Sequence, residues 1–366
     1  MIPVTKPYLP DRKKLDRYID GIYERNWLTN NGPLVQELTR RLEEYLGVEN
    51  LLLVANGTLA LQIAYRVLGV SGQASDTPAE AITTPFSFVA TASSLKWEGV
   101  EPVFADIDPD TWCLDPANIE PAITSRTRAI VPVHVFGNAC EVEAINEIAR
   151  KHNLKVIYDG AHAFGVTYKG ESLLKHGDAA TLSFHATKLF HTVEGGAIVF
   201  KRKEDLEKAK LMINFGLSGP EQIDELGINA KMNEFQAAMG LCVLDEMAEH
   251  LKSRQGIWDR YKFGIEDVAQ LQKRNVHCDN NYTYFPAAFE SKHKVRDLIN
   301  ILGKLEIHPR RYFYPSLDLL NFSDTPAAFV VSRDLSKRIL CFPMYSSMPE
   351  DISETIVFVV KEQQDG

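Results

Sequence analysis

The chain reads VIYDGAH at residues 156–162 and SFHATK at residues 183–188. The first stretch is an apolar β-strand pattern that ends at Asp159, and the second leads from a short apolar run to Lys188. Similar apolar runs recur through the first two-thirds of the chain and alternate with segments of helical spacing. Strands that alternate with helices indicate a mainly parallel sheet that is covered by helices on both faces.

Hydrophobic spacing places the elements of this sheet. Apolar, β-branched runs predict strands at 51–55, 81–84, 101–105, 128–135, 155–158, 179–184 and 196–200. Apolar residues on one helical face predict helices at 58–68 and 142–152. The expected fold class is therefore α/β, with a large, mainly parallel mixed sheet between helices.

The last third of the chain has a different pattern. One apolar helical face predicts a long helix that leaves the sheet and runs toward Tyr261, and this face comprises Phe235, Ala238, Met239 and Cys242. Short strand patterns (282–289 and 339–342) then mix with helical patterns (295–302 and 350–360). We expect a large domain over residues 1–248, with the N-terminal segment, and a smaller α+β domain over residues 249–366.

The composition argues against several classes of protein. The 366 residues are 45% hydrophobic and 24% charged, which is typical of a globular enzyme. The formal net charge of −9 argues against nonspecific binding to nucleic acid or to an anionic membrane surface. No signal-peptide core and no apolar run of about 18 residues is present, so we expect a cytoplasmic protein. The five cysteines show no metal-ligand spacing, which favours reduced, buried thiols.

Lys188 and Asp159 together have the chemistry that pyridoxal 5′-phosphate (PLP) requires. A lysine amine can form a Schiff base with the aldehyde, and a carboxylate can keep the ring nitrogen protonated so that the ring accepts electrons. Asp159 ends a strand that should be buried, and a buried carboxylate needs a cationic partner. The alternatives are a solvated surface lysine and an aspartate that caps a helix.

Other expected strand ends carry groups that suit the rest of this cofactor. Gly57 and Thr58 open a helix, whose free N–H groups and positive end suit a phosphate, although a plain N-cap is the alternative. Phe88 follows another strand and can either stack on a flat ring or belong to the core. His162 is close to Asp159 in sequence and is either a neighbour of the same ring or structural.

These segments together resemble the DegT/DnrJ family of nucleotide-sugar aminotransferases, a group of fold-type I PLP enzymes. The resemblance covers nearly the whole chain, in family order. Its matching segments are WLTNNGP (27–33), ANGTLAL (55–61), TPFSFVAT (84–91), DGAHAFG (159–165), SFHATK (183–188), EGGA (194–197) and residues 229–238.

The resemblance implies a role for each candidate residue around the cofactor ring. Lys188 matches the Schiff-base lysine that also moves the proton, and Asp159 matches the partner of the pyridine nitrogen. Phe88 matches the residue that stacks on the ring. His162 matches the residue beside the ring and its phenolic oxygen.

The resemblance also implies how the phosphate is held. Gly57, Thr58 and Ser183 match phosphate ligands of the same subunit. Asn229 matches an asparagine that reaches the phosphate from the other subunit, so a homodimer with shared active sites is expected. The chain departs from the family at 230–231, where Ala-Lys stands in place of a common Arg or Tyr-Arg.

The implied activity is amino transfer from L-glutamate, which leaves 2-oxoglutarate, to a nucleotide-linked keto sugar. The closest resemblance is to enzymes that convert dTDP-4-dehydro-6-deoxy-D-glucose to dTDP-4-amino-4,6-dideoxy-D-glucose. The alternatives are a C3 keto sugar, a different PLP chemistry and a non-catalytic PLP-binding regulator. Both substrates are anionic, so cations should converge on the cleft, and Arg310 and Arg311 are candidates unless they form surface ion pairs.

Overall fold

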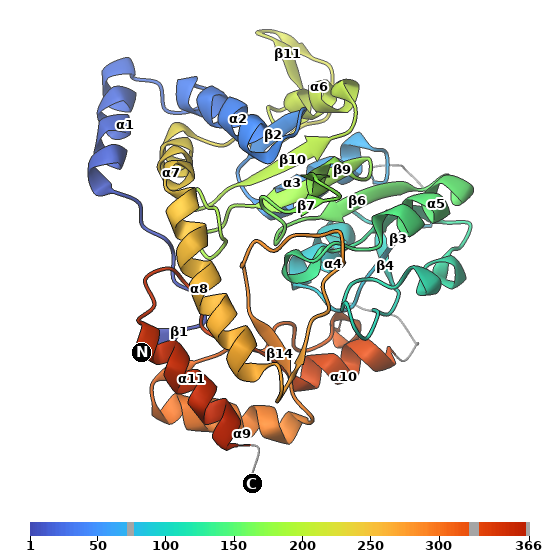
Figure 1. Cartoon of the computed structure of the whole chain (residues 1–366). Coiled ribbons are helices and arrows are strands. Elements are labelled where there is room, and N and C mark those ends of the chain that lie inside the picture. Colours follow the sequence, from blue (N-terminus) through green and yellow to red (C-terminus); the bar gives the residue numbers. More distant parts are fainter. Residues whose placement is uncertain (72–76, 322–328, 364–366) are drawn as a thin grey trace.

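The computed structural model describes residues 1–71, 77–321 and 329–363. Its largest unit is a seven-stranded sheet between two layers of helices (Figure 1). Strand β10 pairs antiparallel with both of its neighbours, whereas the other pairs of the sheet are parallel. The predicted α/β fold with a mainly parallel mixed sheet is therefore confirmed. The strands, in spatial order, are β2 (Leu51–Val54), β10 (Gly196–Phe200), β9 (Ala179–Ser183), β6 (Lys155–Asp159), β5 (Thr127–Val131), β3 (Glu80–Thr83) and β4 (Glu101–Phe104).

Consecutive residues of each strand face opposite layers. In β2, Leu51 and Leu53 join one core cluster, and Leu52 and Val54 join the other. Because both faces are covered, the strands are continuous apolar runs rather than alternating ones. Helices α2 (Pro33–Leu46), α5 (Val142–His152) and α7 (Glu234–Asp245) cover the first face, and α3 (Gly57–Val67), α4 (Val89–Trp97) and α6 (Lys203–Met212) cover the second.

The prediction of one long helix that runs toward Tyr261 is wrong in two respects. It is two helices, since α7 ends before Glu246 (φ −106°) and α8 (Met247–Ile265) begins after it. The expected apolar face is also misplaced, because Phe235 is exposed and Met239 is only partly buried. Helix α7 packs against α1 (Arg12–Arg25), α2 and the sheet, so it buries a wider surface than the single stripe that periodicity detects.

The C-terminal part builds an apolar core of its own. A three-stranded antiparallel sheet packs there with α8, α9 (Lys292–Lys304) and α11 (Glu350–Glu362). Its strands are β13 (Gln270–Leu271), β14 (Pro286–Ala288) and β16 (Ile339–Cys341), so the strand expected at 282–289 is limited to its second half. The α+β character is observed, whereas the division at residues 248 and 249 stays a prediction.

Short pairings join distant parts of the chain. Strand β1 (Ile2–Pro3) pairs in parallel with β15 (Ile307–His308), so the first residues lie on the C-terminal core (Figure 1). There are also two small hairpins, β7 (Thr167–Tyr168) with β8 (Glu171–Ser172) and β11 (Leu217–Gly219) with β12 (Gln222–Ile223). In the first, Tyr168 is buried and pairs with Cys278.

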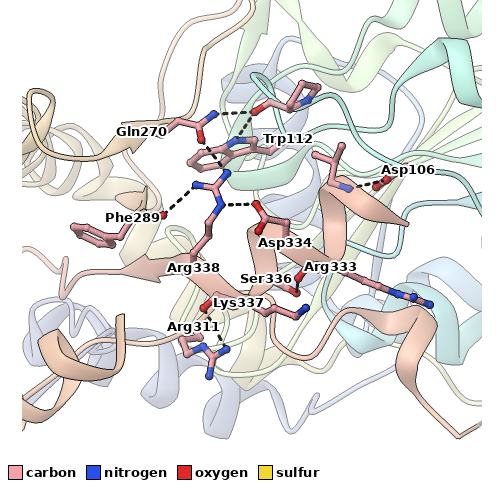
Figure 2. A network of polar contacts seen from close by, with 12 residues as sticks. Asp106, Trp112, Gln270, Phe289, Arg311, Arg333, Asp334, Ser336, Lys337 and Arg338 are labelled. Atoms are coloured by element: carbon pink, nitrogen blue, oxygen red, sulfur yellow. Dashed lines mark hydrogen bonds and ion pairs between the residues drawn. The ribbon is translucent and has the colours of Figure 1, made fainter. Parts of the chain in front are cut away.

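A polar network fastens helix α10 (Val330–Arg338) to the loop that follows β4 (Figure 2). The Asp106 carboxylate accepts hydrogen bonds from the backbone N–H groups of Val331 and Ser332, and so caps the helix. Gln270 of β13 donates to the carbonyl of Pro109 in the same loop. These contacts hold the C-terminal part against the large sheet near the cavity described next. Among the described residues, no helix combines the length and the apolar character that crossing a membrane requires.

Candidate active site

A cavity of about 310 Å³ opens where the carboxyl ends of β2, β5, β6 and β9 meet. In open α/β sheets, ligands bind in the crevice outside these strand ends. Seven of the eight residues singled out from the sequence line this cavity: Gly57, Thr58, Phe88, Asp159, His162, Ser183 and Lys188. The structure thus brings together residues that lie more than a hundred positions apart in the chain.

Asp159 is the last residue of β6 and is 6% exposed. One carboxylate oxygen accepts a hydrogen bond from the Thr91 hydroxyl at 2.7 Å, and the other accepts one from the backbone N–H of Ala161 at 3.1 Å. The Ser87 hydroxyl lies 2.8 Å from that of Thr91 and extends the network. These bonds fix the orientation of a buried carboxylate, and its charge still favours a cation in the cavity.

Lys188 lies beyond β9 and extends its amine into the same cavity. Burial lowers the pKa of the Lys188 amine to about 8; Asp159 acts in the opposite direction, and Arg310 lowers the pKa further. The Nζ atom donates a long hydrogen bond of 3.5 Å to the Tyr284 hydroxyl and lies 5.9 Å from the centre of its ring. An amine with this pKa is neutral in a substantial fraction near neutral pH, as a nucleophile or proton carrier requires.

His162 is buried beside two flat side chains. Its ring is parallel to those of Phe136 and Phe313, with centroids 5.9 Å away in each case. Burial, and then the charge of Lys188, lower the pKa of His162 well below its usual value, so the ring is neutral. Its Nδ1 accepts a hydrogen bond from the Phe136 N–H, which leaves the proton on Nε2.

The start of α3 makes a close contact with the end of β9. The Asn56 side chain caps the helix by accepting from the Leu59 N–H. A Cβ atom at Gly57 would lie 2.8 Å from the Cβ of Ser183, so the glycine is what permits the approach. The first turn, with Thr58 beside Ser183, presents backbone N–H groups and two hydroxyls at one end of the cavity, which is an arrangement that binds phosphate.

Phe88 immediately precedes α4, and 51% of its surface is exposed, on the cavity side. Phe86, two residues earlier, is fully buried in the core. The sequence left open whether Phe88 belongs to the core or faces the cavity. In the structure Phe86 fills the core, and Phe88 offers its ring to the cavity.

Two polar residues considered from the sequence do not line this cavity, and the expected role of Asn229 in a neighbouring subunit stays a prediction. Asn229 is exposed, its backbone pairs with Asn214, and it does not line the cavity in the described chain. Arg310 lines the cavity, whereas Arg311 does not. Instead, the Arg311 guanidinium stacks 3.4 Å from the ring centre of Tyr314 and donates to a backbone carbonyl of α10 (Figure 2).

Sequence reasoning missed the aromatic wall of the cavity and the hydroxyl that orients Asp159. Tyr284, Tyr312 and Phe313 come from the C-terminal part, and Thr91 comes from the first turn of α4. The threonine lies within the quoted segment 84–91, so its spacing from the strand end was an available signal. The three aromatic residues lie outside the segments that carried the resemblance.

Comparison with protein families gives a match over nearly the whole chain. Residues 11–361 match the DegT/DnrJ/EryC1/StrS aminotransferase family. The dTDP-4-amino-4,6-dideoxy-D-glucose transaminase of Shigella dysenteriae is 43% identical, over 98% of both chains. The enzyme of the same name from Escherichia coli is 37% identical, over 96% of this chain and 95% of that protein.

Solved structures agree with the sequence relatives. DesI, crystallised in the presence of its TDP-sugar product, superposes with a TM-score of 0.91 and is 32% identical. The match covers 99% of this chain and 92% of DesI. The similarity therefore extends through both the sheet and the C-terminal part.

Proposed function

The chain belongs to the DegT/DnrJ/EryC1/StrS aminotransferase family, and from this premise we propose that it aminates C4 of dTDP-4-dehydro-6-deoxy-D-glucose with L-glutamate as donor. The enzyme class is that of its relatives, a PLP-dependent sugar aminotransferase. The sugar is proposed from one observation above all, the 43% identity over 98% of both chains with a transaminase of that name. A C3 keto sugar, the alternative from sequence, is not favoured by these relatives.

The residues of the cavity fit PLP. A helix start with two hydroxyls suits the phosphate, and the exposed ring of Phe88 suits the flat face of the cofactor. Among the described residues, no cation forms an ion pair with the buried Asp159, and a pyridinium would supply one. When bound, PLP supplies an electrophilic carbon and a ring that takes up electrons from the substrate.

We propose the following roles for the residues of this chain. Asp159, held by the Thr91 hydroxyl, keeps a proton on the ring nitrogen. Lys188 holds the cofactor between turnovers and, once released as a free amine, carries the proton to and from the substrate carbon, which a pKa of about 8 permits. His162, with its proton on Nε2, donates toward the ring edge, and Phe88 excludes water from the exposed face.

We further propose that the working unit is a homodimer in which Asn229 completes the neighbouring cofactor site. Asn229 lies in an exposed segment that pairs with Asn214, and the next residues on the two segments, Phe215 and Ile228, have half-exposed apolar side chains. Exposed apolar groups around a polar residue are typical of an interface. A cytoplasmic location belongs to the same proposal, since all five cysteines are free thiols.

Subunit exchange tests the shared site. Lys188→Ala protein and Asn229→Ala protein are mixed, each inactive alone, and a mixed dimer then has one site with both lesions and one with neither. Activity should return to roughly a quarter of the wild-type value in an equal mixture at full exchange, because half the dimers are mixed and half of their sites are intact. No recovery despite verified exchange would exclude a site shared through Asn229.

The substrate assignment is tested by product analysis. Purified holoenzyme is incubated with L-glutamate and a panel of dTDP- and GDP-linked 3-keto and 4-keto sugars, and amino sugars are identified by mass and NMR. We expect dTDP-4-amino-4,6-dideoxy-D-glucose as the main product and 2-oxoglutarate in equal amount. A product aminated at C3, or efficient turnover of the GDP sugars alone, would overturn the assignment.

A further inference from the structure

The cavity has to bind an anion for which none of the residues given a role so far is free. The proposed amino donor is a dicarboxylate, and its carboxylates need a cationic partner once they leave water. The helix start and Ser183 are taken by the phosphate of the cofactor in the proposed function, and Lys188 is taken by the reaction itself.

One other permanent cation lines the cavity. Among the described residues of its wall, the carboxylates and basic side chains are those of Asp159, His162, His185, Lys188, Glu194 and Arg310. The amine of Lys188 has a lowered pKa, and the His185 ring lies 3.6 Å from the Glu194 carboxylate. His162 is neutral because burial lowers its pKa. Arg310 is therefore the permanent cation that this chain's own wall offers to a substrate.

We propose that Arg310 binds a carboxylate of the amino donor, an inference that rests on the aminotransferase function proposed above. The planar guanidinium presents two parallel N–H groups that match the two oxygens of a carboxylate. A lysine at this place would offer a point charge without that geometry.

The contacts of Arg310 hold it ready without neutralising it. Its backbone exchanges two hydrogen bonds with that of Cys341, of 3.0 and 2.8 Å, which fix the direction in which the side chain leaves the chain. The guanidinium lies 4.5 Å from the ring centre of Tyr312, another residue of the wall. Within the described chain, no carboxylate forms an ion pair with Arg310, so its charge is available.

Arg310 is also close enough to the reacting amine to affect it. Its charge is one of the causes that lower the pKa of Lys188. The two side chains contact neighbouring tyrosines: Lys188 lies over Tyr284 and Arg310 over Tyr312, and the centres of the two rings are 5.5 Å apart. A donor whose amino group reacts beside Lys188 can therefore extend a carboxylate toward Arg310.

The size of the cavity favours the amino donor over the nucleotide as the partner of Arg310. A volume of about 310 Å³ is at the lower end of the roughly 300–1,000 Å³ that is typical of ligand pockets. The cofactor and an amino acid, or the cofactor and a sugar ring, can share it. A nucleoside diphosphate exceeds the volume that the cofactor leaves and has to lie outside this cavity.

Arg311 provides a matched control, because it has the same charge at the next position and faces away from the cavity. Holoenzymes of the wild type, Arg310→Gln, Arg310→Lys and Arg311→Gln are titrated by calorimetry with glutarate, a dicarboxylate that has no amino group and does not react. In parallel, the half-reaction with L-glutamate is followed by the absorbance of the cofactor in a stopped-flow instrument.

We expect Arg310→Gln to weaken glutarate binding, and to raise the glutamate concentration for half-maximal rate, by about 10- to 100-fold. The glutarate affinity of Arg310→Lys should lie between those of the wild type and Arg310→Gln. The affinity of Arg311→Gln should match that of the wild type. Unchanged visible absorption of the cofactor in each variant shows that the fold is intact.

Three results separate this inference from the proposed function. Wild-type binding of glutarate by Arg310→Gln overturns the inference, and so does a loss of affinity confined to the sugar nucleotide. Wild-type enzyme that binds glutarate through Arg310 but does not react with glutamate leaves the carboxylate site in place and overturns the proposed donor.

Discussion

Gly57→Ala is a direct test of the close contact between α3 and β9. The added Cβ would lie 2.8 Å from the Ser183 Cβ and 3.1 Å from its Cα. Carbon atoms prefer separations of about 3.5–4.0 Å, so one of the two elements has to move. Neither contact atom is the end of a flexible side chain, and Ser183 is anchored by its pairing with Gly196 of β10.

The expected loss of stability follows from this geometry. Forcing an extra methyl group into a packed contact typically costs about 1–3 kcal/mol of unfolding free energy. The displacement also separates the first turn of α3 from the Ser183 hydroxyl, so PLP should bind more weakly. The glycine does not have a left-handed backbone, so the penalty is one of space alone.

The assay compares urea midpoints of the apoproteins by far-UV circular dichroism, and PLP affinity by absorbance. Gly256→Ala is the matched control, because that glycine lies inside α8 and its Cβ would meet nothing within 4 Å. Alanine should stabilise the helix there by about 0.5–1 kcal/mol. Adding Ser183→Gly to Gly57→Ala should recover part of the lost stability, because it removes the nearest atom. A Gly57→Ala protein with the wild-type midpoint and PLP affinity would refute the packing argument.

Three further predictions concern the cavity. Lys188→Ala should reduce turnover by about two to four orders of magnitude and abolish the cofactor's characteristic visible absorption, whereas retention of both would rule out the role of Lys188. The pKa of Lys188 is about 8 in the folded protein and about 10.4 in the unfolded chain; between these values the unfolded chain binds more protons, so the stability of the apoprotein should rise with pH relative to that of Lys188→Met. Parallel urea midpoints of the two proteins from pH 8 to 10.5 would contradict this. Asp159→Asn should fold normally but slow the half-reaction with glutamate, since an amide does not hold the ring nitrogen protonated, and near-wild-type stopped-flow rates would disprove it.

The sequence predicts the strand ends and the residues on them because buried strands are continuous apolar runs. Asp159 and Ser183 end such runs, and the structure places both on the cavity. The sequence does not decide whether Phe88 lies in the core or in the cavity, because a strand end followed by a helix offers both positions to nearby aromatic side chains.

Neighbouring residues on extended backbone are harder to separate. The local sequence does not distinguish Arg310 from Arg311 as the residue that faces the cavity. Side chains of successive extended residues point to opposite sides, so only one of the two can face it. Which side is the cavity depends on the pairing of Arg310 with Cys341, a contact between segments that no local pattern reports. Tyr284 is missed for a similar reason, since the expected strand at 282–289 begins irregularly, with Tyr282 at a φ of 53°.

The pairing of β1 with β15 has a consequence for synthesis. Met1 and Glu306, beside this pair, are separated by 305 positions. At ~5–20 residues per second, the ribosome needs roughly 15–60 s to make the partner of the first strand. During that interval Ile2 has neither the strand that it pairs with nor the complete C-terminal core against which it packs. Nascent chains arrested before residue 305 should therefore lose their first residues to an aminopeptidase that spares the finished protein.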